Sequence, residues 1–391
     1  MPILNDFSMT RTDFSLIIAA GMLVYGIGMP LAGFLESRLG PKPVLLSGAF
    51  IVLISSIWMI LSTNAWHLFL SFGVLLSIGL AFTSQISLTP IICEWFVHRR
   101  GQALFYLSTG SMAGIAIMNP ISNVLINTFS WQNTILIFGV GFSLFIIPVA
   151  LFVLRDDVPE GADKHLRPVP GAKIKAKEIT TEPRELVSDI KVKDAVRTLP
   201  FWQIAIGLFA CGFSMNLLGS HGVPMLNDHG FSSNISAAAV GMIGLVAIPG
   251  TLILGSIADR MQRQWLLALI YFTRGIGFIA IVLVVTTFQL YAVAMIAGLA
   301  WAGNVALSSA ILSELYGVRL VGILYGLTFF VHQIGATIST LLGGWAYETY
   351  GTHLIAFGSA GIFLFIASFA SLKIPNFIRK FTVFKQKATA S

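Results

Sequence analysis

Arg274 is the residue of this sequence best suited to bind an anion. It is the tenth residue of an apolar run, 265–287, that holds no other charged residue. At about 1.5 Å per helical residue, this places it about 15 Å from the start of the run. A charge at that depth in a bilayer costs at least about 2.5–3.5 kcal/mol and normally faces a partner or a water-filled cavity. Two interpretations stay open: a clamp or coupling residue for an anionic substrate, or a structural charge that snorkels inward or pairs with Glu314.

A second candidate for chemistry is the pair His332 and Gln333. They lie eleven and twelve residues past the start of another apolar run, 321–347. An imidazole can take up and release a proton near physiological pH, which suits a proton-coupled carrier. The alternative is a neutral histidine that forms a hydrogen bond between helices.

Four more polar or aromatic side chains interrupt apolar runs. They are Gln85, Asn216, Trp301 and Asn304. Each could contact a solute, or could hydrogen-bond one helix to its neighbour.

The elements that must position these residues are membrane-spanning helices. The 391 residues are 56% hydrophobic and only 10% charged, against about 25% charged in a usual soluble domain. Runs of about 20 apolar residues cross a bilayer as helices, which satisfy every backbone polar group internally. The sequence therefore predicts an all-α polytopic membrane protein with eleven spans. These are 14–35, 44–62, 67–92, 102–128, 133–154, 201–226, 235–257, 265–287, 289–313, 321–347 and 353–373.

One long charged segment, 155–200, divides the chain. It holds ten of the 24 Lys and Arg residues. We interpret it as a cytoplasmic linker between a five-span bundle, 1–154, and a six-span bundle with a tail, 201–391. All Lys and Arg residues except Arg11 and Arg274 fall in the linker, the tail or alternate loops on one side. The positive-inside rule makes that side cytoplasmic, in a cell inner membrane.

The two bundles contain a repeat. Three features recur in order at offsets of 220 to 222 residues. They are Gly33-x-x-x-Ser37-Arg38 with Gly255-x-x-x-Asp259-Arg260, Glu94 and Arg99 with Glu314 and Arg319, and Gly114 with Gly335. Parallel repeats of this size are typical of secondary transporters.

The paired loops are candidates for a cytoplasmic gate. Their glycines would let neighbouring helices approach closely, and their charges could pair across the gap and bias a two-state motion. The residues are Gly33, Arg38, Lys42, Gly255, Asp259 and Arg260. The alternative is that the basic residues only set the topology.

The repeat also exposes a gap. The second Gly-x-x-x-Asp-Arg loop follows two spans, 201–226 and 235–257, whereas the first follows only 14–35. Residues 4–8 resemble 226–232, the loop after the unmatched span. We therefore expect the first half to lack its opening helix, through a late start assignment or a truncation.

These motifs resemble the major facilitator superfamily, in particular its monocarboxylate-transporter-like bacterial branch. The resemblance rests on GFLESRLGPK at Gly33–Lys42, EWFVHRRGQ at Glu94–Gln102, GSIADR at Gly255–Arg260 and ELYGVRLVGILYG at Glu314–Gly326. It implies two six-helix bundles around a central site. The eleven spans of this chain would then correspond to the family's twelve without the first.

The resemblance also bears on the candidates. It implies that spans 67–92, 201–226 and 289–313 line the cavity, and that the helix of Arg274 is peripheral. Carboxylate-selective members place an arginine where this chain has Thr251, so lactate specificity is not expected. Ser37 replaces an expected aspartate, and Glu36 is a possible substitute.

We interpret the chain as a secondary active transporter of a small organic solute, a monocarboxylate-like anion, coupled to protons. Open alternatives are an exporter of drugs or amphipathic metabolites, and a non-transporting sensor or assembly platform. No phosphate-binding loop, catalytic set or metal-ligand spacing is present, so no enzyme, cofactor or metal is expected. The two cysteines, Cys93 and Cys211, form no disulfide framework. The expected partners are a solute and the bilayer, without nucleic acid, and the protein is expected to be a monomer.

Overall fold

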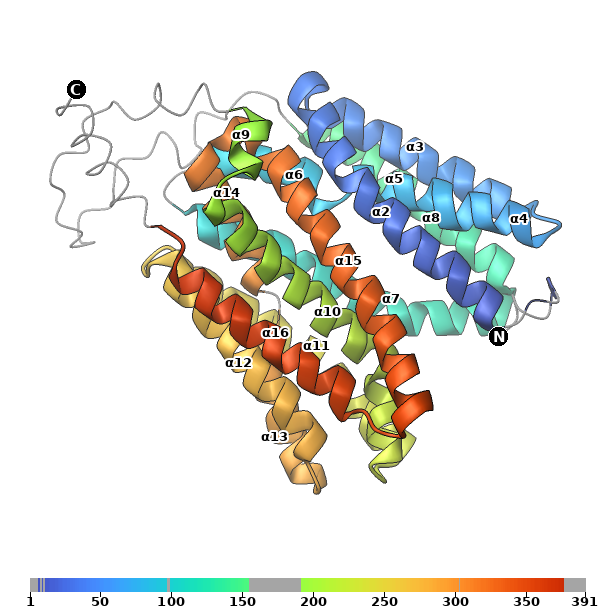
Figure 1. The fold of residues 1–391 in the computed structure, drawn as a ribbon. Helices are drawn as coiled ribbons and strands as arrows, with labels where there is room; N and C mark the ends of the chain where they lie inside the picture. The colour runs from blue at the N-terminus through green and yellow to red at the C-terminus, as the bar shows by residue number, and fades with distance from the viewer. Residues whose placement is uncertain are drawn as a thin grey trace, which may run out of the picture.

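The computed structural model describes residues 6–7, 9, 11–96, 99–154, 191–301 and 303–375, and its elements in these ranges are helices (Figure 1). Ten helical segments are long and apolar enough to cross a membrane. The predicted all-α, polytopic membrane fold is confirmed. Most of the predicted charged linker, 155–190, lies outside the described residues, as does the C-terminal tail from residue 376.

The helices follow the predicted spans closely. The first half contains α2 (Arg11–Leu39), α3 (Pro41–Ile60), α4 (Ala65–Leu68), η1 (Phe69–Leu76), α5 (Ser77–Phe82), α6 (Gln85–Trp95), α7 (Arg100–Phe129), α8 (Trp131–Pro148) and η2 (Val149–Val153). The second half contains α9 (Val192–Val196), α10 (Leu199–Asp228), α11 (Ser233–Ala258), α12 (Arg263–Leu283), α13 (Thr287–Leu299), α14 (Gly303–Tyr316), α15 (Val318–Tyr350) and α16 (Leu354–Leu372). The remaining predicted span, 102–128, is helix α7, which is not among these ten.

Two spans that were predicted to be continuous are broken. The span 67–92 breaks between α5 and α6, where the Thr83 hydroxyl donates to the Gly79 carbonyl and the Ser84 hydroxyl caps α6. The span 289–313 breaks between α13 and α14, at Ala300 and Trp301. Ser and Thr hydroxyls compete with helical backbone bonds, so a Thr-Ser pair favours such a break. Gln85 and Asn304 stand at the starts of the half-helices that follow.

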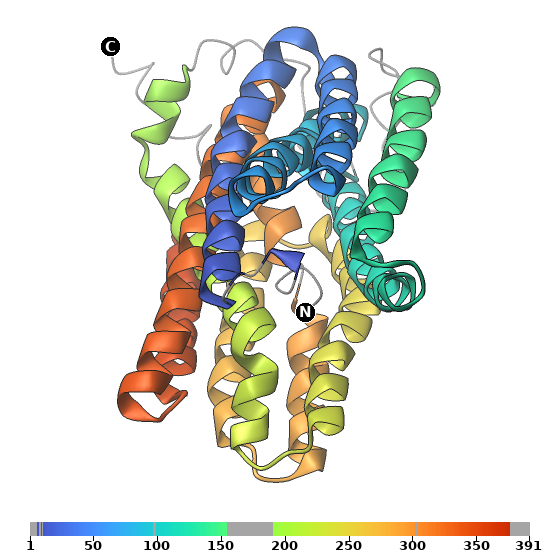
Figure 2. The same cartoon turned by 90° about the vertical axis from the view of Figure 1, so that its right-hand side faces the viewer.

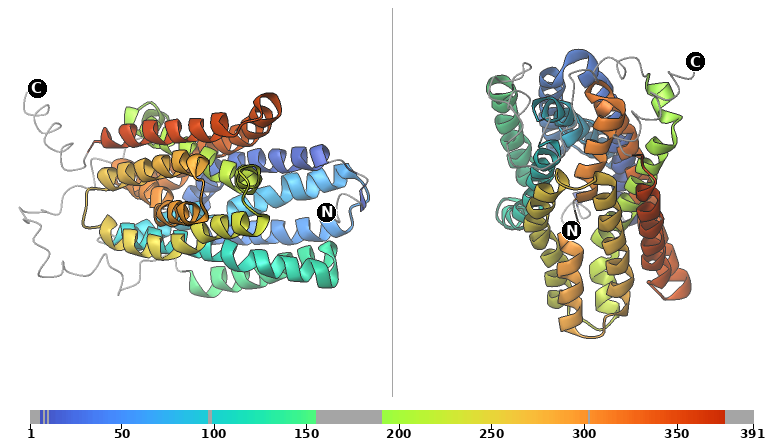
Figure 3. Two further views of the ribbon diagram at one scale, coloured as in Figure 1. Left: turned by 90° about the horizontal axis from the view of Figure 1, so that it is seen from below. Right: turned by 90° about the vertical axis from the view of Figure 1, so that its left-hand side faces the viewer.

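The two halves meet through α2 with α15 and α7 with α11 (Figures 1 and 2). Their last long helices, α8 and α16, lie at opposite outer edges of the molecule (Figure 3). Glycines allow the close approach of α2 and α15: a Cβ on Gly33 would overlap with the Gly322 backbone, and one on Gly326 would lie 2.6 Å from the Met29 carbonyl oxygen. We call the end with the α2–α3, α6–α7 and α11–α12 connections the basic end.

The repeat is visible in the contacts of the opposite end. The Asp6 carboxylate accepts a hydrogen bond of 2.6 Å from the Trp131 indole at the start of α8. The Asp228 carboxylate contacts the His353 imidazole, 2.8 Å away, just before α16. Both residues of the second pair lie 222 positions after those of the first. The likeness of residues 4–8 to 226–232 therefore extends to a shared contact.

The repeat-matched glycines Gly114 and Gly335 differ in how closely another helix packs against them. A Cβ on Gly335 of α15 would overlap with the Phe209 carbonyl oxygen of α10, whereas one on Gly114 of α7 would meet no atom within 4 Å. We therefore expect Gly335→Ala to destabilise the protein by about 1–3 kcal/mol, the usual cost of overpacking. Gly114→Ala, the matched control, should be neutral or stabilising because it removes a helical glycine. Melting temperatures in detergent measure both, and equal losses would contradict the difference in packing.

Candidate functional site

At the basic end, Asp259 joins the two halves. Its Oδ1 and Oδ2 atoms each accept a hydrogen bond of 2.9 Å, from the backbone N–H groups of Gly101 and Gln102 respectively. These amides are the free donors at the start of α7, where the helix dipole favours a negative charge. A Cβ on Gly101 would lie 2.6 Å from Oδ1, so the contact requires glycine there.

Three more charged residues, Arg263, Glu314 and Arg100, form hydrogen bonds or ion pairs next to this contact. Arg263 donates to Asp259 over 2.7 Å and also pairs with Glu314 of α14. Arg100 donates to the Ser313 hydroxyl, 3.3 Å away, and to the Cys93 carbonyl, 2.9 Å away. The set Asp259, Arg263, Arg100 and Glu314, which we call the basic-end lock, links α6, α7, α11, α12 and α14. Sequence reasoning missed Arg263, although its place four residues after Asp259 was a usable signal.

The repeat counterpart of Asp259 is Ser37, which does not bridge the two halves in the same way. Glu36 is 9% exposed, and its Oε2 atom would lie 3.1 Å from a Cβ on Gly322 near the start of α15. Ser37 instead donates to the Phe34 carbonyl of its own helix.

The remaining gate candidates lie at this end as well. Arg38 is exposed and lies over the Phe34 ring, 4.4 Å from its centroid. Arg260 is exposed and Lys42 is half-buried. A Cβ on Gly255 would lie 2.9 Å from the Cβ of Phe105, which shows how closely α11 approaches α7.

Arg274 is fully buried inside the second half. Its guanidinium donates to the Ser214 hydroxyl (2.8 Å), the Trp301 carbonyl (3.3 Å) and the Cys211 sulfur (3.5 Å). The Cζ atom also lies 4.5 Å from the Trp301 ring centroid, a cation–π contact. Glu314, the partner that the sequence offered for a structural role, pairs with Arg263 instead.

Other buried polar atoms surround Arg274. Several lack a well-formed hydrogen bond with any other described residue. They are Arg274 Nε, Tyr271 Oη, Asn304 Nδ2, Ser308 Oγ and both ring nitrogens of His332. The His332 ring stacks on Phe329 with centroids 4.5 Å apart, and it neighbours the Cys211 sulfur. Buried polar groups are usually well paired, so this concentration of weakly paired ones makes the region a candidate site for a polar ligand or water. We call it the Arg274 cluster.

The structure separates the other candidates from this cluster. The Asn216 amide donates to the Ala336 carbonyl, 3.0 Å away, and to the Thr340 hydroxyl, so it joins α10 to α15. The Gln333 Cβ would lie 3.0 Å from a Cβ on Gly26, at the contact between the halves. Gln85 belongs to the first half.

Four predicted residues thus come together: Arg274, Trp301, Asn304 and His332. Sequence reasoning missed Cys211, Ser214, Tyr271 and Ser308, because serine, cysteine and tyrosine are common in membrane-spanning helices and carry little signal there. The position at which the resemblance implied an arginine holds Thr251, whose hydroxyl is hydrogen-bonded to that of Thr109 over 2.6 Å. In the part of the chain that the structure describes, no group of acidic, His and Cys side chains could hold a metal ion.

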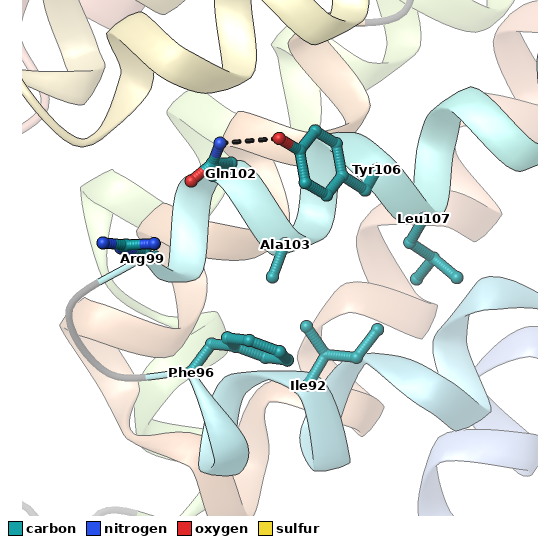
Figure 4. Close-up of a pocket in the computed structure, with 7 residues that line it drawn as sticks. All are labelled: Ile92, Phe96, Arg99, Gln102, Ala103, Tyr106 and Leu107. Atoms are coloured by element: carbon teal, nitrogen blue, oxygen red, sulfur yellow. Dashed lines mark hydrogen bonds between the residues drawn. The ribbon is translucent and has the colours of Figure 1, made fainter. Parts of the chain in front are cut away.

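A separate cavity of about 470 Å³ lies at the basic end between α6 and α7 (Figure 4). Its walls are mostly apolar, and the Gln102 amide donates to the Tyr106 hydroxyl over 2.6 Å at one side. The lining residues are Ile92, Phe96, Arg99, Gln102, Ala103, Tyr106 and Leu107. The cavity lies apart from the Arg274 cluster, which belongs to the second half.

Comparisons with known proteins agree with this architecture. A family model described as Major Facilitator Superfamily matches residues 1–339. The chain is 25% identical over 389 residues to an uncharacterized MFS-type transporter, YcxA, of Bacillus subtilis, covering 97% of this chain and 90% of that protein. It is 24% identical to monocarboxylate transporter 12-B of Danio rerio, covering 93% and 78%. The crystal structure of the MFS transporter FucP in the outward conformation shares the fold, with a TM-score of 0.67, 14% identity and coverage of 95% and 92%.

Proposed function

Because the chain belongs to the Major Facilitator Superfamily, we propose that it is a proton-coupled secondary transporter that carries a small organic anion across the inner membrane by alternating access. The observation that carries the proposal is the buried Arg274 guanidinium, whose hydrogen bonds to the described residues go to a hydroxyl, a backbone carbonyl and a cysteine sulfur, and not to a carboxylate. A buried charge without an opposite charge is costly, so a transported anion would supply the missing partner.

The chemistry of the Arg274 cluster favours a carboxylate. Its groups include the N–H of Arg274 Nε, the amide of Asn304 and the hydroxyl of Tyr271, which can all donate. An arginine binds carboxylates strongly through charge-assisted hydrogen bonds. Trp301 covers the guanidinium at the break between α13 and α14, so a movement at this break would admit the anion. Relatives named monocarboxylate transporters support the same class of solute.

His332 is the proposed proton carrier. Its ring is buried beside the Cys211 sulfur, which in turn contacts Arg274. A proton on His332 would add a second positive charge beside Arg274. An anion in the cluster would offset that repulsion, so binding of the anion and of the proton would favour each other.

The proposed conformational cycle uses the basic-end lock as the cytoplasmic gate. The lock connects the halves in this state, and α2 and α15 touch through glycines at the same end. Toward the opposite end, Cβ atoms on Gly241 and Gly244 of α11 would meet nothing within 4 Å. These contacts support a state in which the halves are held together at the basic end, the proposed cytoplasmic side.

Uptake into proteoliposomes tests the function. Purified protein in vesicles should accumulate one or more labelled monocarboxylates when the lumen is alkaline, and uptake should fall when an ionophore removes the pH gradient. Export of apolar drugs without any carboxylate uptake would instead support the exporter. A complete lack of solute movement over a broad panel would contradict both.

We expect His332→Gln to flatten the pH dependence of carboxylate uptake. The wild-type rate should rise as the pH falls, because the proton must bind His332, whereas glutamine keeps hydrogen-bonding capacity without titrating. Initial rates between pH 5 and 8 give the profile. The matched control is His67→Gln, a half-buried histidine in α4 of the first half. An unchanged profile for His332→Gln would remove this residue from the coupling role.

A further inference from the structure

The ends of α10, α15 and α16 meet around His353, at the end opposite the basic end (Figure 1). Its Nε2 atom lies 2.8 Å from the Oδ2 atom of Asp228, the last residue of α10. Its ring stacks on the Tyr347 ring of α15, with centroids 4.4 Å apart and 18° between the planes. Pro224 removes one backbone hydrogen bond from the last turns of α10, so this end depends more on outside contacts. His353 is only 6% exposed, and it therefore ties the end of α10 to α15 and α16.

The first half has the same arrangement without histidines. Trp131 lies 222 positions before His353, and its indole likewise donates to an aspartate, Asp6, over 2.6 Å. Phe7 lies 222 positions before His229. The Phe7 and Trp131 ring centroids are 6.0 Å apart, and those of His229 and His353 are 6.4 Å apart. Both rings of the first half are thus replaced by imidazoles, whose charge changes between about pH 5 and pH 8, whereas Phe and Trp do not titrate.

A proton on His353 would strengthen both of its contacts. The Nδ1 atom is buried without a hydrogen-bond partner among the described residues, so it can take up a proton while Nε2 keeps its contact with Asp228. An imidazolium and a carboxylate form a charge-assisted hydrogen bond, roughly twice as strong as a neutral one, and an aromatic face such as that of Tyr347 attracts a cation. These two gains offset the cost of burying a charge. A proton on the other imidazole here, His229, would be repelled by the first, so we expect one proton to bind.

We propose that Asp228, His353 and Tyr347 form a proton-sensitive brace, which holds the end of α10 more tightly when His353 takes up a proton. By the proposed topology this end faces the compartment opposite the cytoplasm, so the brace responds to the pH of that compartment. Because α10 also supplies Ser214 to the Arg274 cluster, the brace acts on a helix of the candidate site. The proposal does not depend on which solute is carried or on which group inside the cluster carries a proton.

Local opening at the end of α10 measures the strength of the brace. Leu226→Cys places a thiol at a fully buried position, against a low background because both native cysteines are buried. A buried thiol reacts with N-ethylmaleimide only after local opening. The reference is the same variant with His353→Trp, which copies Trp131 and keeps a ring N–H that does not titrate. The labelling rate with His353, divided by the rate with His353→Trp, should fall about fivefold from about pH 8 to about pH 6, the difference between a neutral and a charge-assisted bond. A ratio that stays the same, or that rises toward acid, would contradict a brace tightened by protons.

Two further variants separate the brace from a general effect of pH on the protein. Asp228→Asn keeps the His353 ring but removes its opposite charge, so the pH dependence of the ratio should disappear. His229→Phe copies Phe7 and should keep the pH dependence, because the contact between His353 and Asp228 is intact. A pH dependence that survives Asp228→Asn, or that is lost in His229→Phe, would overturn the proposal. If His353→Trp does not fold, His353→Gln is the reference that does not titrate. None of these readouts requires transport, so the brace and the proposed function are tested separately.

Discussion

Replacing Arg274 by glutamine is expected to reduce carboxylate uptake about a hundredfold or more, since losing one partner of a buried charged pair costs several kcal/mol of binding. The guanidinium is fully buried and has no carboxylate partner among the described residues, so the solute is its proposed counter-charge. Arg274→Lys keeps the charge but loses the planar fork and the stacking on Trp301, and it should restore little uptake. Initial rates in proteoliposomes measure these effects.

The stability of the same variants separates function from structure. Removing an uncompensated buried charge should leave the melting temperature unchanged or raise it, because buried charges are expensive. If Arg274 were purely structural, its variants would give the reverse result: a lower melting temperature and normal uptake per folded molecule. Lys373→Gln is the matched control, because it removes an exposed positive charge just after α16. It should change neither readout.

Asp259→Asn is expected to release the basic-end lock. The carboxylate accepts two backbone hydrogen bonds from α7 and one from Arg263, and an amide lacks the charge that strengthens all three. Hydrogen bonds to charged groups contribute about 1.5–3 kcal/mol, so the population closed at this end should fall about tenfold or more relative to the open one. Uptake should slow because the cycle needs both states.

A distance measurement checks this shift directly. Spin labels at Leu39 and Met261, both exposed at the basic end, report the separation of the two halves. Asp259→Asn should move the distance distribution toward longer values. Glu348→Gln, which neutralises an exposed carboxylate at the other end of α15, should not. Identical distributions for wild type and Asp259→Asn would show that the carboxylate does not hold the halves together.

The sequence repeat identified several residues used in these predictions, but not the contacts that they make. The offset near 221 paired Gly114 with Gly335, but it could not indicate that one would be covered and the other open. It placed Asp259 at a gate, yet its partners proved to be backbone amides about 158 residues earlier rather than the side chains of Arg38 or Lys42. A motif identifies a residue that is suited to a contact, but not the donor that it meets.

The sequence by itself determined which segments form membrane-spanning helices, because an apolar segment in lipid must satisfy its own backbone hydrogen bonds whatever surrounds it. It did not show that two of these spans are broken. The repeat was also visible in the sequence, because it depends only on the spacing of matched residues along the chain. Only the tertiary structure decided that Arg274 lies among Ser214, Cys211 and Trp301, and that Glu314 belongs to Arg263. Which polar groups meet depends on how helices far apart in the chain rotate and approach one another. The rotation and approach of these helices depend on packing and on small residues in several helices, so they cannot be predicted from any single segment.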